Sequence, residues 1–333
     1  MEMREKEMLA VVEALANQPT APFREDAVRT EIEAQLGKIP HVKFERDGFG
    51  NIIAHYQRGR RRAPVWGLAA HMDHPGWVRD REGELRFLGS VAPRFRSNPK
   101  KRSFGDFEMW DLSPFEIRDR QIHSRACDDL LGCAEIICVF RQLEEKAANV
   151  HCVGLFTRAE EVGFVGAIKL AQAGILARNL TILSLETSTP RGTAEIGRGP
   201  IVRVGDKISS FDGSATALLL STAQEEEIPV QRCLLDGGTC EATAYQLYGY
   251  TCAAASLALG NYHNVTPVGT IAMEYVAIDD FVGMVRLCVA AVLRGGKAHE
   301  PQRALRKKLE ENARSYREFY STIRSKPDLE EKL

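Results

Sequence analysis

Strand-like and helix-like patterns alternate along this chain, and the alternation predicts its fold. Residues 63–73, 150–163 and 179–188 each contain an apolar run of strand length. Residues 128–146 and 164–173 carry apolar side chains at helical spacing instead. Such alternation is typical of a mostly parallel central sheet with helices on both faces. We therefore expect an α/β fold whose ligand sites lie at the carboxyl ends of the strands.

The amino-terminal region predicts two helices and a hairpin ahead of this alternation. The first helix is amphipathic and precedes Thr20, which with Pro22 gives a start signal for a second helix running to about Leu36. Residues 41–57 then read as two strands joined by an Asp-Gly turn.

Residues 76–122 interrupt the alternation. They contain four short strand-like segments and a basic stretch, APRFRSNPKKRSFGD, which together predict a small β insertion domain. The basic stretch reads either as a solvated loop or as a grip for acidic substrates. The main domain is then discontinuous and consists of residues 1–75 and 123–300. Residues 301–333 are highly charged with a weak helical repeat, which predicts a C-terminal helix or tail that is either peripheral or an oligomer contact.

Charge and composition exclude several classes of partner. The 333 residues carry a formal net charge of −1, so no overall field attracts nucleic acid or an anionic membrane. No apolar run reaches the roughly 18 to 20 residues that span a bilayer, and acids near the start do not suit a secretory signal. We therefore expect a cytoplasmic protein that acts on a small molecule or peptide. The eight cysteines form no C-x-x-C pair, which favours reduced, buried thiols.

Histidines and acids recur where the predicted strands end or a helix begins. Each is a weak signal in isolation, because such acids also serve as helix caps or solvated loop residues and a lone His is more often structural. The order of these residues along the chain is typical of a two-metal hydrolase. Five ligands serve two zinc ions when both ions share one carboxylate. The residues concerned are His71, Asp73, Asp128, Asp129, Glu160, Glu161, Glu186 and His263.

Two of these motifs have a geometric interpretation. His71 and Asp73 are two residues apart on a strand, so their side chains share a face and Asp73 can orient the histidine. This spacing favours His71 over His74 as the ligand. Glu160 and Glu161 would point to opposite faces of an extended strand, but a turn at the following glycine changes that. One acid can then bind metal while its neighbour faces the attacking water.

Five segments around these residues form a recognisable combination. They are AAHMDHPGWV, ACDDLLG, FTRAEEVGFVGA, LSLETSTP followed by GRGPIVRVGD, and DGGTCEATAYQLYGYTCAAASLALGNYHNVTP. Together they resemble the tetrahedral and glutamyl aminopeptidase family of co-catalytic di-zinc metallopeptidases, over most of residues 20–290. The resemblance implies a zinc-peptidase/phosphorylase-like α/β fold and aminopeptidase activity.

The resemblance also implies a role for each candidate residue. Asp128 would bridge two metal ions, and Glu160 would be the general base, with Asp73 behind His71. A cis peptide bond is implied between Asp128 and Asp129. The implied metal ligands are His71 and Glu186 on one ion, Glu161 and His263 on the other, and Asp128 on both.

Some positions depart from the pattern of the family. Leu130, Cys240 and Asn261 stand where the family usually has Arg, Asp and Arg, and Glu186 stands where Asp is more frequent. Metal binding tolerates these changes, whereas substrate selection depends on them. The insertion is also shorter than the family's usual second domain, which favours a dimer over a twelve-subunit particle. The implied substrate-binding residues are Gly238, Thr239 and Glu241.

The sequence thus predicts a metal-dependent aminopeptidase that hydrolyses N-terminal residues of short peptides. Two divalent ions are expected, with zinc first and cobalt or manganese as alternatives, because carboxylate-rich sites with His accept all three. Expected partners are short peptides and further copies of the chain, as a dimer or larger oligomer, without nucleic acid or membrane. Two alternatives stay open: a di-zinc deacylase or carboxypeptidase-like amidohydrolase, and a catalytically silent binding or assembly module.

Overall fold

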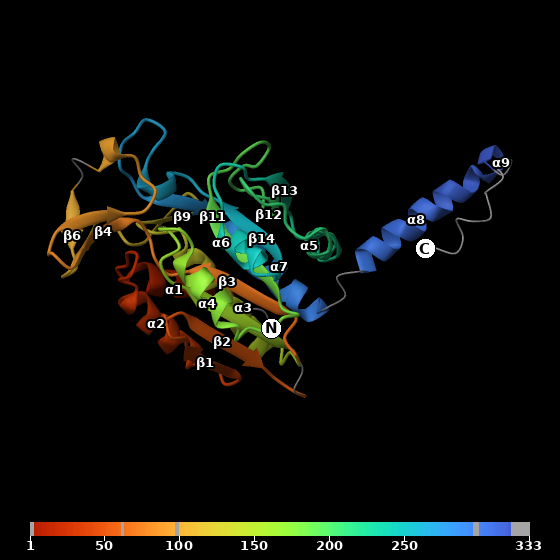
Figure 1. Ribbon diagram of the computed structural model, residues 1–333, viewed down its shortest axis with the longest axis horizontal. Coiled ribbons are helices and arrows are strands. Elements are labelled where there is room, and N and C mark those ends of the chain that lie inside the picture. The colour runs from red at the N-terminus through yellow and green to blue at the C-terminus, as the bar shows by residue number, and fades with distance from the viewer. Residues whose placement is uncertain (1–2, 61–62, 97–99, 296–299, 321–333) are drawn as a thin grey trace.

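The computed structural model describes residues 3–60, 63–96, 100–295 and 300–320. They form an eight-stranded central sheet covered by helices, two smaller antiparallel sheets, and a helix that projects from the body (Figure 1). The predicted α/β fold with a mostly parallel central sheet is confirmed.

The central sheet has the strand order β1-β2-β10-β3-β11-β14-β12-β13. Its middle strands, β10, β3, β11 and β14, are mutually parallel, while β2 and β12 run antiparallel to their inner neighbours. Four carboxyl ends therefore meet at one edge of the sheet. The strand bounds are β1 Val42–Arg46, β2 Ile52–Gln57, β3 Trp66–His71, β10 His151–Thr157, β11 Thr181–Ser188, β12 Ile201–Gly205, β13 Gln231–Leu234 and β14 Thr251–Ala258.

Helices bury both faces of this sheet. Along β3, Leu68 and Ala70 belong to one apolar cluster and Ala69 to the other, as the two-residue period of a strand requires. All eight cysteines are free thiols, and all except Cys233 are buried, as predicted. On the first face lie α1 Glu5–Ala16, α2 Asp26–Leu36, α3 Leu130–Glu145, α5 Gly213–Glu225 and α7 Ile278–Arg294; on the second lie α4 Val165–Ala173 and α6 Glu241–Leu247.

Two smaller sheets contain the remaining strands. One has the order β5-β4-β7-β6, and the other has the order β15-β9-β8, so that a late strand of the chain joins the end of the predicted insertion. Their bounds are β4 Gly76–Arg79, β5 Leu85–Leu88, β6 Lys101–Ser103, β7 Phe107–Trp110, β8 Glu116–Arg118, β9 Gln121–Ser124 and β15 Glu274–Ala277, with 3₁₀ helices η1 Pro93–Phe95 and η2 Tyr262–Asn264.

Part of the basic stretch forms a strand that the pattern did not indicate. β6 is an edge strand whose three residues are all exposed, so it has no apolar alternation to detect. Lys101 forms an ion pair with Glu108 at 2.8 Å and lies 4.8 Å from the ring of Trp77. Charged residues on an edge strand discourage further strand pairing. Residues 97–99 of this stretch lie outside the described residues.

The second helix begins later than its start signal suggested. The Thr20 hydroxyl donates to the carbonyl oxygen of Met72 at 2.7 Å, so it serves a tertiary contact instead of a helix cap. The helix starts at Asp26, after the buried Glu25. A contact distant in sequence thus takes over the residue that local pattern assigned to capping.

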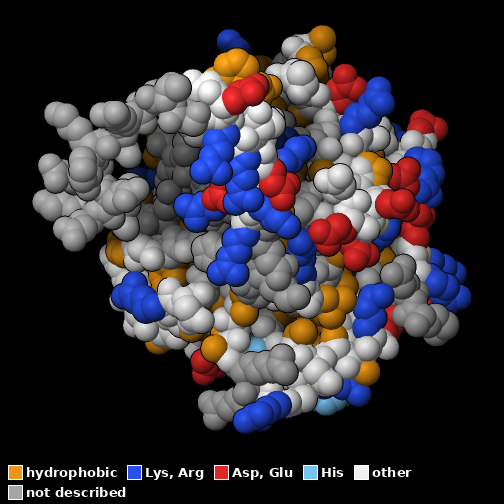
Figure 2. Space-filling view, turned by 90° about the vertical axis from the view of Figure 1, so that its right-hand side faces the viewer, with side chains coloured by type: hydrophobic (Ala, Val, Ile, Leu, Met, Phe, Trp, Pro, Cys, Tyr) orange, Lys and Arg blue, Asp and Glu red, His pale blue; other side chains and the backbone are white. Residues whose placement is uncertain are grey.

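The C-terminal region forms α8 Glu300–Ser315 and α9 Arg317–Tyr320, and α8 projects away from the body (Figure 1). Leu305 and Leu309 are exposed on α8. Figure 2 shows the molecule from the side on which α8 projects, and Lys and Arg side chains gather near the centre of that view. The rest of the predicted tail, residues 321–333, lies outside the described residues. Among the described helices, none is both long and apolar enough to cross a membrane.

A buried acid in α3 gives a prediction about stability. Glu135 is fully buried, neither carboxylate oxygen has a hydrogen-bond partner among the described residues, and burial raises its pKa well above 4.5. Above pH 4.5 only the unfolded state ionises readily, which favours unfolding. We expect Glu135→Gln to raise the free energy of unfolding at pH 8, because the amide gains no charge when the chain unfolds.

Denaturant unfolding at pH 4 and pH 8 checks this expectation. The gain should shrink below pH 4.5, where both states are protonated. Glu145→Gln on the same helix is the control, because that side chain is exposed and its replacement should change little. Equal gains for Glu135→Gln at both pH values would contradict the explanation.

Candidate active site

The parallel strands bring the predicted residues to one edge of the sheet. His71 is the last residue of β3, and Glu160 and Glu161 follow the end of β10. Glu186 lies two residues before the end of β11, and His263 follows β14 in η2. All five side chains are at least largely buried. The site is therefore built where a parallel sheet normally places its ligands.

The paired aspartates at the start of α3 have different contacts. The Asp129 carboxylate caps the helix by accepting the N–H of Gly132 at 3.3 Å, and it also accepts the N–H of His71 at 3.3 Å. A Cβ on Gly132 would lie 2.5 Å from this carboxylate, so glycine is required there. Asp128 instead faces the Nε2 atoms of His71 at 3.4 Å and His263 at 3.5 Å. The peptide bond between the aspartates is cis, as the resemblance implies.

His71 is oriented by the main chain of Asp73. Its Nδ1 lies 3.0 Å from the Asp73 carbonyl oxygen, which turns Nε2 toward Asp128 and places it 3.8 Å from Glu160 Oε2. The Asp73 carboxylate lies 3.6 Å from His71 Nδ1 and accepts the N–H groups of Glu160 at 2.9 Å and Glu161 at 3.1 Å. Asp73 therefore orients the histidine and fixes the backbone of the acid pair at the same time.

The loop before the acid pair is held by a second buried carboxylate. Glu25 accepts the N–H of Ala159 at 3.1 Å and the Arg158 Nε–H at 2.7 Å. Ala159 has a φ of 54°, a left-handed conformation that turns the chain between β10 and the acids. The turn lets both acids face the site. The Glu160 side chain is 11% exposed, and the Glu161 side chain points toward His263.

His263 is fixed on three sides. Its main-chain N–H donates to Glu274 Oε1 at 2.8 Å, and its Nδ1 lies 3.2 Å from the carbonyl oxygen of Ser90. Its Nε2 lies 3.1 Å from Glu161 Oε1 and points at Asp128. His74, the alternative to His71, has both ring nitrogens occupied away from the acids: Nδ1 lies 2.6 Å from the Asp128 carbonyl oxygen and Nε2 3.0 Å from the Asn264 side chain.

The crowded charges shift the ionisation of these groups. Burial raises the pKa of Glu160 well above its usual value, and nearby carboxylates add to the increase. Burial alone would lower the pKa of His71, but the charge of Glu160 and contacts with Asp128 outweigh it and raise that pKa. Burial would raise the pKa of Asp128, but His263 and His71 hold it below its usual range. The site thus concentrates negative charge around two imidazoles.

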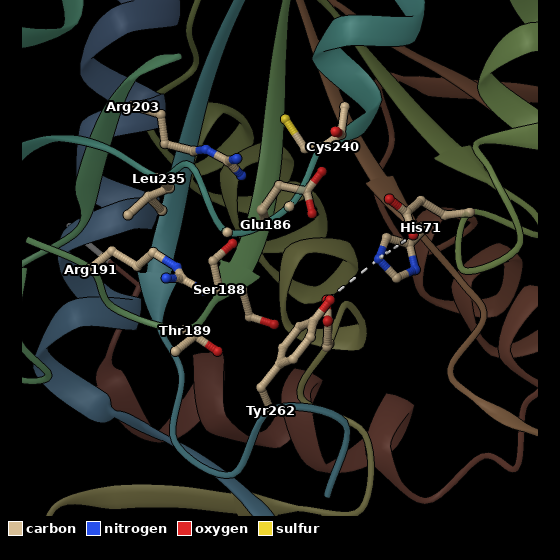
Figure 3. Close-up of a pocket in the computed structure, with 15 residues that line it drawn as sticks. His71, Glu186, Ser188, Thr189, Arg191, Arg203, Leu235, Cys240 and Tyr262 are labelled. Atoms are coloured by element: carbon tan, nitrogen blue, oxygen red, sulfur yellow. Dashed lines mark ion pairs between the residues drawn. The ribbon is translucent and has the colours of Figure 1, made fainter. Parts of the chain in front are cut away.

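A pocket opens beside these side chains (Figure 3). Of the predicted substrate-binding residues, Gly238 and Thr239 line it, whereas Glu241 is fully buried beneath. The main-chain N–H of Glu241 reaches Glu186 at 3.4 Å, and burial raises the pKa of its carboxyl to about 8. The lining residues are His71, Asp128, Glu160, Glu186, Thr187, Ser188, Thr189, Arg191, Arg203, Leu235, Gly237, Gly238, Thr239, Cys240 and Tyr262.

Sequence reasoning did not find three contributors to this site. Arg191 and Arg203 line the pocket on the side opposite His71 (Figure 3). Glu274 lies on β15 with no exposed surface and contacts the backbone of both Asp128 and His263. Arg191 lies in the segment between β11 and β12, Arg203 on β12, and Glu274 in MEYVAIDDF. None of these residues is unusual in its local sequence, so no signal marks them.

The donor atoms of the site fit divalent metal ions. Asp128 Oδ1, Glu161 Oε1 and His263 Nε2 are buried and have no hydrogen-bond partner in the described part of the chain. Buried polar atoms normally have a partner, and a cation bound between these three atoms would provide one. Imidazole and carboxylate donors suit zinc, cobalt and manganese. Two overlapping sets have ligand atoms within 4.8 Å of one another: His71, Asp128 and Glu161, and His71, Glu160 and Glu186.

Comparisons with known proteins identify the family of this chain. The family model described as M42 glutamyl aminopeptidase matches residues 94–278. A curated relative from Acetivibrio thermocellus, named "Putative aminopeptidase", is 27% identical over 344 residues, which cover 87% of this chain and all of the relative.

Solved structures share the fold. An aminopeptidase from Desulfurococcus kamchatkensis superposes with a TM-score of 0.72 at 20% identity, over 87% of this chain and 96% of its own. The TET1 peptidase of Pyrococcus horikoshii, which can assemble into a tetrahedron or a large octahedral shell, gives 0.71 at 19% identity, over 86% and 99%. Since the family model matches more than half of the sequence, this chain belongs to the M42 glutamyl aminopeptidase family.

Proposed function

We propose that this chain is a metal-dependent aminopeptidase that removes N-terminal residues from short peptides. The observation that carries the proposal is that the two adjacent acids, Glu160 and Glu161, face different groups. Glu161 Oε1 lies 3.1 Å from the Nε2 of His263, whereas Glu160 lines the pocket beside His71. This difference supports Glu161 as the metal ligand and Glu160 as the base.

The donor atoms support two metal positions, assigned here as the family resemblance implies. The His71 position would use His71, Glu186 and Asp128, and the His263 position would use Glu161, His263 and Asp128. Zinc is the first candidate, with cobalt or manganese as alternatives. Divalent ions held there would supply Lewis acidity toward the scissile carbonyl and make water easier to deprotonate.

Glu160 is the group that moves the proton in this mechanism. Its main-chain N–H donates to Asp73 Oδ1 at 2.9 Å, which fixes the residue relative to His71. Its carboxylate takes a proton from the attacking water and then donates it to the leaving amine, the ordinary cycle of a general base and acid. The 11% exposure of its side chain leaves it open to the pocket while most of its surface is shielded from bulk water.

The pocket favours a substrate with a carboxylate in its N-terminal side chain. Arg203 is 3% exposed, its Nε has no hydrogen-bond partner, and none of the described carboxylates forms an ion pair with it. Among the described residues, Arg203 Nη1 donates to Ser256 Oγ at 3.4 Å, and the guanidinium carbon lies 5.9 Å from the centre of the Phe211 ring. A buried guanidinium without a carboxylate partner is costly, and a substrate carboxylate would offset that cost. The glutamyl preference in the family's description agrees with this chemistry.

A substrate panel tests the function and its specificity together. We expect release of N-terminal Glu or Asp from free-amine peptides, and little activity on N-acylated amino acids. Arg203→Met should lower kcat/KM for the acidic substrates by a factor of about 10 to 100, the value of one charge-assisted hydrogen bond. It should leave neutral substrates nearly unchanged.

Arg198→Met is the control for this change, because Arg198 has an exposed side chain and pairs with Glu195 outside the pocket. Activity confined to blocked substrates would favour a deacylase and sink the aminopeptidase proposal. No hydrolysis of any amide in the panel, with metal bound, would favour the catalytically silent alternative.

We also propose that the chain forms a homo-oligomer in the cytoplasm. The assembly of the Pyrococcus horikoshii relative supports self-association in this fold. The short predicted insertion of residues 76–122 favours a dimer over a larger shell, a point that light scattering of the purified protein would decide.

A further inference from the structure

One buried carboxylate joins two ligand segments that are distant in sequence. Glu274 on β15 has no exposed surface. Its Oε2 accepts the N–H groups of Cys127 at 2.7 Å and Asp128 at 3.0 Å, and its Oε1 accepts the N–H of His263 at 2.8 Å. Both oxygens of Glu274 are therefore used on the main chains that carry Asp128 and His263.

These main chains have no regular secondary structure to fix them. His263 has a φ of 53° inside η2, and Asp128 lies between β9 and the start of α3. Buried N–H groups in such segments need an acceptor from elsewhere. An ionised carboxylate makes shorter and stronger hydrogen bonds than a neutral acceptor does. Glu274 thus fixes the two ligand-bearing backbones relative to each other, together with His74, whose ring contacts the Asp128 carbonyl oxygen and the Asn264 side chain.

We infer that Glu274 is a positioning residue for the His263 position of the metal site. This inference rests on the proposed function, because it concerns the two metal positions defined there. Glu274 holds Asp128 and His263 so that Asp128 Oδ2 and His263 Nε2 stand 3.5 Å apart. It acts through backbone contacts and is not among the residues that line the pocket.

The insertion completes the orientation of His263 from the other side. The Ser90 carbonyl oxygen lies 3.2 Å from His263 Nδ1, so this nitrogen donates its proton and Nε2 keeps its lone pair for metal. Gly89 makes that approach with a φ of 117°, and a Cβ there would lie 2.7 Å from Pro75. Glu274 thus fixes the backbone of His263, and Ser90 fixes its ring.

A residue with the same local chemistry provides a matched control. Asp280 is also fully buried and accepts two main-chain N–H groups, from Gly197 and Gly199, both at 2.7 Å, where Glu274 accepts three. The segment that contains these glycines includes no predicted metal ligand. Replacing either acid by its amide removes an acceptor for buried N–H groups, but only Glu274→Gln removes it from the ligand segments.

Zinc binding to the metal-free full-length chain tests the inference, by competition with a chromophoric chelator. Wild-type protein should bind two zinc ions, and Glu274→Gln should weaken one of them by a factor of about 10 to 100, the usual effect of losing a ligand's supporting contact, and the other less. KM should change little while kcat falls. Asp280→Asn should lose stability but bind zinc as the wild type does.

Three outcomes separate the possibilities. If Glu274→Gln binds both zinc ions with wild-type affinity, Glu274 is only structural and the inference is overturned. If Glu274→Gln does not fold, as judged by circular dichroism, Glu274→Asp is measured instead, and unequal weakening of its two sites supports the inference whereas unchanged affinities overturn it. Failure of the wild type to bind zinc or cleave peptides would count against the proposed function and thus remove the basis of the inference.

Discussion

Replacing Glu160 with glutamine is expected to lower kcat/KM by a factor of about 10² to 10⁴, the usual contribution of a general base, while the metal content stays unchanged. Glutamine preserves the size of the side chain but cannot accept a proton from water. The main-chain N–H of residue 160 would still donate to Asp73, so the loop should keep its conformation. Steady-state rates on the best peptide and metal analysis of the same sample check both parts.

The neighbouring acid supplies the contrast for this experiment. Glu161→Gln should lose metal from the His263 position, because Glu161 Oε1 lies 3.1 Å from His263 Nε2 and has no hydrogen-bond partner among the described residues. Added zinc should then restore part of its activity but none of the activity lost in Glu160→Gln. The reverse pattern, metal loss in Glu160→Gln alone, would show that the two roles had been exchanged.

The sequence could predict those features that local pattern determines. Apolar runs located the parallel strands, and the residue type at each strand end then placed His71, Glu160 and Glu186 along one edge. Asp129 followed the same logic, because an acid before an apolar helix is a common cap, and the structure shows that cap bonded to Gly132. Parallel strands place their carboxyl ends at the same edge of a sheet. These positions could therefore be predicted without knowing any contact between distant residues.

Contacts between distant segments could not be predicted in this way. Nothing near Glu274 indicates that its carboxylate accepts N–H groups from residues 127, 128 and 263. Asp73 was expected to support His71 and does so mainly through its carbonyl oxygen, while its carboxylate holds the acid pair. Thr20 was diverted from capping in the same manner. In each case the deciding partner is distant in sequence.

The pocket arginines illustrate the same limit for substrate selection. Arg203 lies in GRGPIVRVGD, where an alternating strand pattern gives no reason to expect a buried cation. Arg203 is a candidate for substrate recognition because it has no carboxylate partner among the described residues. Only the packing reveals this. The residues at strand ends thus predict the fold and the metal chemistry. Substrate specificity depends instead on which residues of neighbouring strands lie close together.

Removal of metal should abolish peptide hydrolysis and destabilise the fold. Dialysis against a strong chelator would leave two sets of carboxylates gathered around His71 without a metal ion: Asp128 with Glu161, and Glu160 with Glu186. Zinc that binds only the folded state stabilises it by about 2.7 kcal/mol per site when its concentration is a hundred times Kd. We therefore expect the melting temperature to fall on chelation, and to rise again with activity as zinc is returned.

The stoichiometry of that recovery distinguishes one metal from two. If Asp128 is shared between two positions, activity should recover fully only near two zinc ions per chain, and cobalt or manganese should replace zinc with altered rates. Asp128→Asn should weaken both positions, because both His71 and His263 face its carboxylate at 3.4 and 3.5 Å. Glu274→Gln should weaken the His263 position more than the His71 position, because Glu274 holds both His263 and the shared Asp128. Full activity after exhaustive chelation, or complete recovery with a single zinc ion, would contradict the two-metal mechanism while leaving the peptidase family assignment intact.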